Sequence, residues 1–397
     1  MNRELGRGRS MPGFSLVELL VALAIALLVT SAVFAMLDPA AGAFQTQPEA
    51  ADVQQRLRAS TEALYRDLLA AGSGPSTALA SRSSGQLAAA VFPMRIGRRS
   101  PDAPGTFNDS RVTVWHVSPA AAQTTLASPL ASASGTVTVA SGPGCPNADP
   151  SCGFRAGMTA AVFGPSGAWD LFSIISVQGN SLTLQHNLRD APVVYPAGDT
   201  LIAEVTIRTY FFKDDPAAGG PQFMRYDGTG AADAPVVEHL ARLQFELLGE
   251  AEPAALVPAT DLSEPKRVTY GPLPPEASVQ LTAYPPGENC AFVRTAGGAI
   301  ASRLPRLAGG PALVPLTASL LTDGPWCPDA ANPNRYDADL LRVREIVVTL
   351  ALESTVAALR GPAGSLFTRG GTARGTRTVP DRVARLVVAP RALNAGR

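Results

Sequence analysis

The most constraining feature of this chain is an uncharged stretch of nineteen residues, Leu19–Leu37, close to its N-terminus. An α-helix of that length, at about 1.5 Å per residue, nearly crosses a hydrocarbon core of roughly 30 Å. The leader before it, residues 1–13, holds three arginines against one glutamate, and basic flanks stay on the cytoplasmic side of a membrane. We therefore expect a transmembrane helix over residues 14–38, with the remainder of the chain exported.

Glu18 is an acidic residue at the start of this apolar helix. A carboxylate inside a membrane helix costs about 2.5–3.5 kcal/mol on insertion scales and is rarely found without a partner. The residues before it read Gly13-Phe14-Ser15-Leu16-Val17, a glycine followed by a large apolar residue. A plain membrane anchor needs neither this junction nor the acid.

The junction Gly13–Glu18 resembles the processing site of type IV prepilins, the class III signal shared by pilins and type II secretion pseudopilins. The resemblance implies that prepilin peptidase cleaves between Gly13 and Phe14 and that the same enzyme N-methylates Phe14. The new amine would lie four residues from Glu18, near one face of the first helical turn. In pilins this acid meets the terminal amine of a neighbouring subunit, so the resemblance implies an assembly role for Glu18.

Three other interpretations of the segment compete with this one. An ordinary secretory signal would use Ala41-Gly42-Ala43 as its cleavage site, but the apolar region is too long for one. A plain anchor leaves Glu18 without a purpose. The core helix of a water-soluble protein would rarely be so uniformly apolar.

Composition fits an exported protein and suggests no strongly charged partner. The chain has 33 basic and 33 acidic residues, so no nucleic-acid partner is indicated by its charge. Its 36 glycines and 35 prolines predict many loops and irregular segments.

The four cysteines indicate structural disulfides in an oxidising compartment. Cys145 and Cys152 bracket a turn-rich loop that a bridge would close, and Cys290 would then pair with Cys327 across a Pro/Gly-rich segment. Four cysteines allow three connectivities, and the sequence alone leaves all three open. A metal site is the alternative, but the chain has no Cys-x-x-Cys motif and no histidine near any of the four.

Residues 39–74 predict an amphipathic continuation of the helix, because apolar side chains recur along one face. These side chains are Val53, Leu57, Leu64 and Leu68. Pro39 and Pro48 predict a bend or a local loss of helix where the chain leaves the membrane. The run that begins at Gly72 predicts the end of the helix.

Strands dominate residues 75–397, which we expect to form a periplasmic or surface head. The predicted strands are Arg111–Val117, Gly135–Ala140, Phe172–Val177, Ser181–Gln185, Leu201–Phe212, Gln222–Gly228, Val236–Leu248, Leu340–Leu352 and Arg382–Val388. One long helix followed by strands predicts an α+β fold in which an antiparallel sheet covers the helix. Pro119–Ser134 instead predicts a flexible loop or linker, and residues 118–200 as a whole suggest an inserted β subdomain.

Several short segments resemble PilW-type minor pilins, and their order along the chain gives the resemblance its value. The segments are Asp52–Arg58, Tyr65–Gly72, Thr209–Phe212, Met224–Asp227, Leu243–Glu246, Leu341–Arg344 and Pro390–Asn394. The last departs from the family pattern at Ala392. The first two also resemble the J-type minor pseudopilin of type II secretion. The resemblance covers both ends of the chain well and the middle poorly.

The search for catalytic or metal-binding motifs finds little. The three histidines share no local motif with a cysteine or a carboxylate pair, and nucleophile-elbow, phosphate-loop and zinc-helix patterns are missing. Asn332–Asp339 offers several oxygen ligands, as calcium loops do, but lacks the spacing of an EF-hand. A solvated turn is the favoured interpretation of that segment. We expect no enzyme activity and no cofactor.

The sequence thus predicts a minor pilin of PilW type that helps to initiate and cap a type IV pilus, in motility, adhesion or DNA uptake. Its expected partners are prepilin peptidase, other minor pilins, the major pilin, the inner-membrane assembly platform and, before assembly, the lipid bilayer. It would be a single-pass protein of the inner membrane with a periplasmic head, and later a protein of the pilus tip at the cell surface. A type II secretion minor pseudopilin is the alternative, and a membrane-tethered adhesin or enzyme is the second. An inserted subdomain at 118–200 would be an adhesive surface or, more often, a tolerated insertion.

Overall fold

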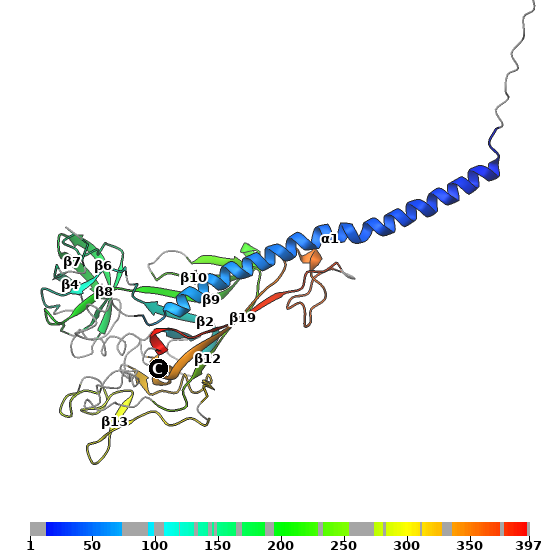
Figure 1. Ribbon diagram of the computed structural model, residues 1–397. Coiled ribbons are helices and arrows are strands. Elements are labelled where there is room, and N and C mark those ends of the chain that lie inside the picture. The colour runs from blue at the N-terminus through cyan, green and yellow to red at the C-terminus, as the bar shows by residue number, and fades with distance from the viewer. Residues whose placement is uncertain are drawn as a thin grey trace, which may run out of the picture. The chain divides into compact units, whose positions relative to one another are not determined.

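The computed structural model describes fifteen stretches of the chain. These are residues 13–73, 94–98, 107–118, 120–130, 134–141, 145–146, 149–163, 169–186, 194–228, 233–253, 274–280, 283–309, 312–327, 336–373 and 377–394. They form two compact units, Met1–Gln54 with Ser354–Pro380 and Gln55–Glu353 with Asp381–Arg397. The fold is mixed α+β, as the sequence predicts: a long N-terminal helix precedes antiparallel sheets (Figure 1).

The helix α1 runs without interruption from Leu16 to Ala70. The predicted loss of helix at Pro39 or Pro48 is therefore wrong. A proline removes one backbone donor from the helix ladder, and the hydrogen bonds of the neighbouring residues still span the site. The predicted end of the helix is confirmed, because Gly72 follows α1 with φ of 77°, in the left-handed region that a C-terminal helix cap requires.

The first unit combines the first part of α1 with the segment that follows β18 (Val343–Leu352). Glu49 joins the two, since its Oε1 accepts hydrogen bonds from Ser354 Oγ at 2.8 Å and from the backbone nitrogen of Thr355 at 2.6 Å. The carboxylate of Glu49 therefore attaches the start of this segment to the helix through hydrogen bonds.

The second unit contains two antiparallel sheets built from strands far apart in the sequence. The five-stranded sheet has the order β1-β2-β9-β10-β11, with bounds Met94–Arg98, Phe107–His116, Thr206–Asp215, Gly220–Tyr226 and Ala234–Glu238. The four-stranded sheet has the order β15-β12-β18-β19, with β15 at Val314–Pro315, β12 at Leu240–Gly249 and β19 at Arg382–Val388. Leu57, Leu64 and Leu68 of α1 are buried, as their spacing predicts.

A third sheet of six strands closes into a small barrel (Figure 1). Its order is β3-β8-β5-β6-β7-β4, with bounds Gln123–Thr125, Leu201–Glu204, Thr159–Phe163, Trp169–Gln178, Ser181–His186 and Ser134–Thr138. The first and last strands meet through a bridge between Leu126 and Val139 and a hydrogen bond from Ala127 N to Thr138 O at 2.7 Å. Closure removes the open edges of the sheet and encloses a core that includes Phe154, Phe172 and Leu182.

The predicted flexible loop at Pro119–Ser134 is wrong where the structure describes it. Residues 123–130 contribute β3 and the bridges at Leu126 and Leu130, and both leucines are buried in the barrel. Pro119 and residues 131–133 lie outside the described residues. The Ala/Ser/Pro-rich composition of the segment conceals the two leucines, which are buried in the barrel core with Val139 from the β4 end of the sheet and with distant residues such as Tyr195.

Two long predicted strands are each split in the structure. Leu201–Phe212 becomes β8 and β9, which lie in different sheets on either side of Val205. Val236–Leu248 becomes β11 and β12, separated by His239, whose φ of 56° breaks the extended conformation. The first part of Leu340–Leu352 is a 3-10 turn, η2 (Ala338–Arg342), before β18 begins.

Two further short pairs lie in the second unit. β13 (Phe292–Arg294) pairs with β14 (Ile300–Ser302), and β16 (Trp326–Cys327) pairs with β17 (Tyr336–Asp337). The disulfide between Cys290 and Cys327 joins the segments that carry these two pairs.

Candidate functional site

The candidate site is the N-terminal junction, where the described chain begins at Gly13 and α1 begins at Leu16. Ser15 and Glu18 form a reciprocal capping box. The Glu18 backbone nitrogen donates to Ser15 Oγ at 3.2 Å, and the Ser15 backbone nitrogen donates to Glu18 Oε2 at 2.9 Å. Two of the backbone donors that every helix leaves unpaired at its N-terminus are thereby satisfied.

This geometry gives Glu18 a second role beside the one implied by the resemblance. Its carboxylate is held over the first turn by the backbone nitrogen of Ser15, the residue that follows Phe14, and the nitrogen of Phe14 would become the new terminus on cleavage. The Ser-x-x-Glu spacing is a local helix-start signal, and it was available from the sequence. Phe14 itself is 86% exposed, so nothing in the described chain covers the proposed processing site.

The segment after the junction meets the requirements of a membrane span by length and composition. Leu16–Met36 is apolar, and none of it is buried within the protein. An apolar helix left wholly uncovered by its own chain is the opposite of a buried core helix. Thr30 satisfies its hydroxyl within the helix by donating to Ala26 O at 2.6 Å, as hydroxyl side chains in membrane helices do.

A buried polar contact joins the far end of α1 to β9 in the second unit. Asp67 Oδ2 accepts hydrogen bonds from the Tyr210 hydroxyl at 2.6 Å and from Arg208 Nη1 at 3.0 Å. Burial, followed by the Asp67 hydrogen bond, raises the pKa of the Tyr210 phenol. Burial alone would lower the pKa of Arg208, but the Asp67 carboxylate outweighs it and raises that pKa. The contact fixes the rotation of this helical turn relative to β9.

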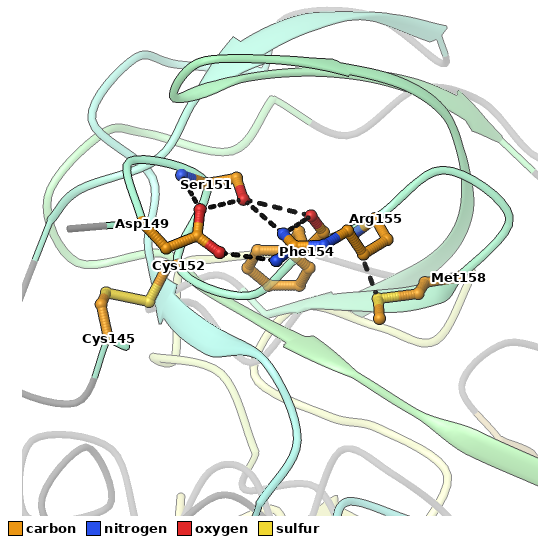
Figure 2. Close-up of polar contacts among 7 residues, drawn as sticks. All are labelled: Cys145, Asp149, Ser151, Cys152, Phe154, Arg155 and Met158. Atoms are coloured by element: carbon orange, nitrogen blue, oxygen red, sulfur yellow. Dashed lines mark hydrogen bonds and ion pairs between the residues drawn. A yellow bond between two sulfur atoms is a disulfide. The ribbon is translucent and has the colours of Figure 1, made fainter. Parts of the chain in front are cut away.

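Both disulfides join the cysteine pairs that the loop spacing suggested. Cys145 is bonded to Cys152, and Cys290 to Cys327. Figure 2 shows the first bridge beside a compact turn in which Asp149 Oδ1 accepts from the Ser151 hydroxyl at 2.6 Å. Arg155 donates to the other carboxylate oxygen, Oδ2, at 2.8 Å. These hydrogen bonds to Ser151 and Arg155 lower the pKa of Asp149 to about 2.

The favoured solvated turn at Asn332–Asp339 is wrong for its described part. Asn332–Arg335 lie outside the described residues, whereas Tyr336, Asp337 and Asp339 are at most 4% exposed. These residues lie in and beside β17, which pairs with β16, a strand whose Cys327 is bonded to Cys290. Local composition does not reveal such nonlocal burial.

Three carboxylates lie within 4.8 Å of one another in this region, those of Asp323, Asp337 and Asp339. Asp337 accepts hydrogen bonds from the backbone nitrogens of Gly324 at 2.8 Å and Asp339 at 2.9 Å. Asp339 accepts from Arg342 Nε at 2.5 Å. Two of the three carboxylates, those of Asp337 and Asp339, thus accept hydrogen bonds from protein groups. Burial nevertheless raises the pKa of Asp337 to about 7 and also raises that of Asp339, although Arg342 opposes the latter shift.

A second buried ionisable group lies inside the barrel. Asp170 Oδ1 is 3.0 Å from His186 Nε2, and its Oδ2 accepts from the Tyr195 hydroxyl at 2.7 Å. Burial, with the Asp170 charge, raises the pKa of Tyr195. No local sequence pattern predicts this triad, because β6, β7 and the loop before β8 contribute one residue each. Asp170 and Tyr195 are both buried, and we assign the triad a structural role.

Comparison with known proteins identifies the N-terminal junction. The family model of the prokaryotic N-terminal methylation motif matches residues 9–34, which include Gly13, Phe14 and Glu18. No curated protein matches the chain. The match covers the processing site and most of the apolar span, and it does not include any residue after 34. The motif and the uncovered apolar helix together support a membrane-anchored precursor of the type IV pilin-like class.

Proposed function

We propose that the chain is a minor pilin of PilW type. Prepilin peptidase cleaves it between Gly13 and Phe14 and methylates the new amine, and the mature protein then assembles with other minor pilins and the major pilin. In this role it starts and caps a type IV pilus and catalyses no reaction. The observation that carries the pilin-class part of the proposal is the match of the N-terminal methylation motif to residues 9–34.

The capping box supports an assembly role for Glu18 on physical grounds. A capped helix start fixes the carboxylate at the N-terminal end of α1, on the backbone nitrogen of Ser15, one residue after Phe14. In a low-dielectric setting a fixed carboxylate strongly favours an arrangement that brings a neighbour's amine to it. The order of the PilW-like segments along the head supports the finer assignment within the class.

The capping box also supplies a matched pair of variants that separates helix capping from charge. Glu18→Gln keeps a side chain that can complete the box, since glutamine serves in that position, but it removes the charge. Ser15→Ala keeps the charge and removes one capping hydrogen bond, at a cost of about 1 kcal/mol. We expect Ser15→Ala protein to be processed and assembled, and Glu18→Gln protein to be processed but absent from sheared pili.

The measurement is the N-terminal mass of the protein from membranes and from the sheared surface fraction. A mature chain that starts at methylated Phe14 and appears with pili supports the proposal. A chain that starts at Met1 or near Phe44 contradicts it, as does normal assembly of the Glu18→Gln variant. Recovery of the mature protein in a secretion pseudopilus, with pili unaffected by its loss, would favour the type II secretion pseudopilin, which shares the motif.

A further inference from the structure

Among the strands that the structure describes, β19 (Arg382–Val388) forms one edge of its sheet. All seven of its residues pair with β18 on one side, and β19 is the last strand in the order of its sheet. Within the described stretches no strand pairs with its other side. In an antiparallel ladder about half of a strand's backbone groups point to each neighbour, so β19 presents a row of unpaired N–H and C=O groups.

Charged and apolar side chains both lie exposed along this edge strand; the charges disfavour pairing of the edge with a copy of itself, and the valines leave apolar surface beside it. Val383 and Val387 are 63% and 52% exposed. They share a face with Arg385, which lies between them, because side chains alternate along a strand. This face continues onto β18, where Val383 lies opposite Ala351 and Val387 opposite Val347, both of which are buried. The exposed valines therefore lie at the outer margin of an apolar sheet face whose β18 residues, Ala351 and Val347, are buried.

The edge is also basic. Arg382 and Arg385 are exposed, and within the residues that the structure describes neither has a hydrogen bond or an ion pair. The seven residues of β19 contain no acidic side chain. Two copies of β19 paired with each other would gather four arginines on one ribbon, and like charges that face each other across strands are destabilising. A second copy of β19 is therefore the wrong occupant for this edge.

We propose that β19 accepts an extended segment of another protein subunit as an additional antiparallel strand. The segment would carry the pattern apolar-x-acidic-x-apolar, so that its apolar side chains lie beside Val383 and Val387 and its carboxylate lies beside Arg385. Main-chain hydrogen bonds along the open edge supply affinity, and the alternate side chains supply selectivity, as in strand addition generally. The inference is independent of the pilus assignment and holds for any assembly in which the head meets a partner chain.

The test fuses a probe strand to the C-terminus of the full chain through a flexible Gly/Ser linker. Such a tether gives an effective concentration in roughly the millimolar range, which makes weak strand addition observable. The probe sequence is Thr-Val-Thr-Glu-Thr-Val-Thr, and its control has lysine in place of glutamate. Hydrogen exchange of the β19 amides is then measured with the protein in detergent.

The glutamate probe should slow exchange of the outward-facing β19 amides at least about threefold more than the lysine probe, because a favourable cross-strand charge pair replaces a repulsive one. Arg385→Glu should reverse this preference, whereas Arg58→Glu, on an exposed position of α1, should leave it unchanged. Equal protection by both probes, no protection by either, or an Arg385→Glu variant that keeps the original preference would overturn the proposal. Protection of β19 in the unfused chain with a rise in molecular mass would also overturn it, in favour of self-association. None of these outcomes bears on processing at Gly13.

Discussion

The buried carboxylate of Asp337 predicts that the second unit loses stability as pH rises toward neutrality. Asp337 is 0% exposed, and its burial raises its pKa from 3.8 to about 7. A carboxyl group with a raised folded-state pKa binds its proton more tightly in the native than in the unfolded protein. Its contribution to stability is thus complete below pH 3.8 and is lost as pH rises through about 7.

The size of the effect follows from the same shift. One pKa unit corresponds to about 1.4 kcal/mol, so a rise from 3.8 to about 7 is worth at most about 4 kcal/mol between acid and mildly alkaline pH. Asp337→Asn replaces the titratable carboxyl group with an amide that carries no charge at any pH. The asparagine keeps one of the two acceptor positions that now serve Gly324 and Asp339. The variant is therefore expected to be less stable than the wild type near pH 4.5 and to show a much flatter dependence on pH.

The assay is urea unfolding of the full chain with its disulfides intact, at pH 4.5 and at pH 8. Tryptophan fluorescence is a suitable readout, because Trp326 lies opposite Asp337 in the β16–β17 pair. The quantity to compare is the change in unfolding free energy between the two pH values, wild type against variant, so that other titrating groups cancel. Asp323→Asn is the control. The Asp323 charge contributes to the raised pKa of Asp337, and Asp323 is exposed, so this variant should change the pH dependence less than Asp337→Asn does. An identical pH dependence in wild type and Asp337→Asn would refute the reasoning.

Three further predictions follow from contacts in the same unit. Tyr210→Phe removes a buried donor to Asp67 and should lower the unfolding free energy by about 1–3 kcal/mol, measured by urea titration; an unchanged midpoint contradicts it. Asp149→Asn should reduce stability above pH 4 and have no such effect near pH 2, because Asp149 has a lowered pKa of about 2; melting temperatures at the two pH values test the sign. Replacing Cys290 and Cys327 by serine opens a loop that spans 37 residues and should lower the unfolding free energy by about 4 kcal/mol in the chain-entropy model. Replacing Cys145 and Cys152, which are 7 residues apart, should lower it by about 2 kcal/mol.

The sequence was most informative where structure depends on neighbouring residues. The apolar span, the processing junction and the end of α1 at Gly72 are all local patterns, and the structure or the motif match agrees with each. The strand Arg382–Val388 was also predicted with its observed bounds. The capping box of Ser15 and Glu18 belongs to the same local class, and its spacing allows it to be predicted from the sequence alone.

Features that depend on residues far apart in the chain were decided by the tertiary structure. Leu126 and Leu130 looked like part of a flexible linker until the barrel supplied their partners. The sequence predicts a solvated turn at Asp337 and Asp339, whereas both are buried in the structure, beside the disulfide-linked strand β16. The sequence left three cysteine connectivities open, and the fold selects one. Helix caps and apolar periodicity act over a few residues, whereas burial and strand pairing depend on which distant segments the folded chain brings together.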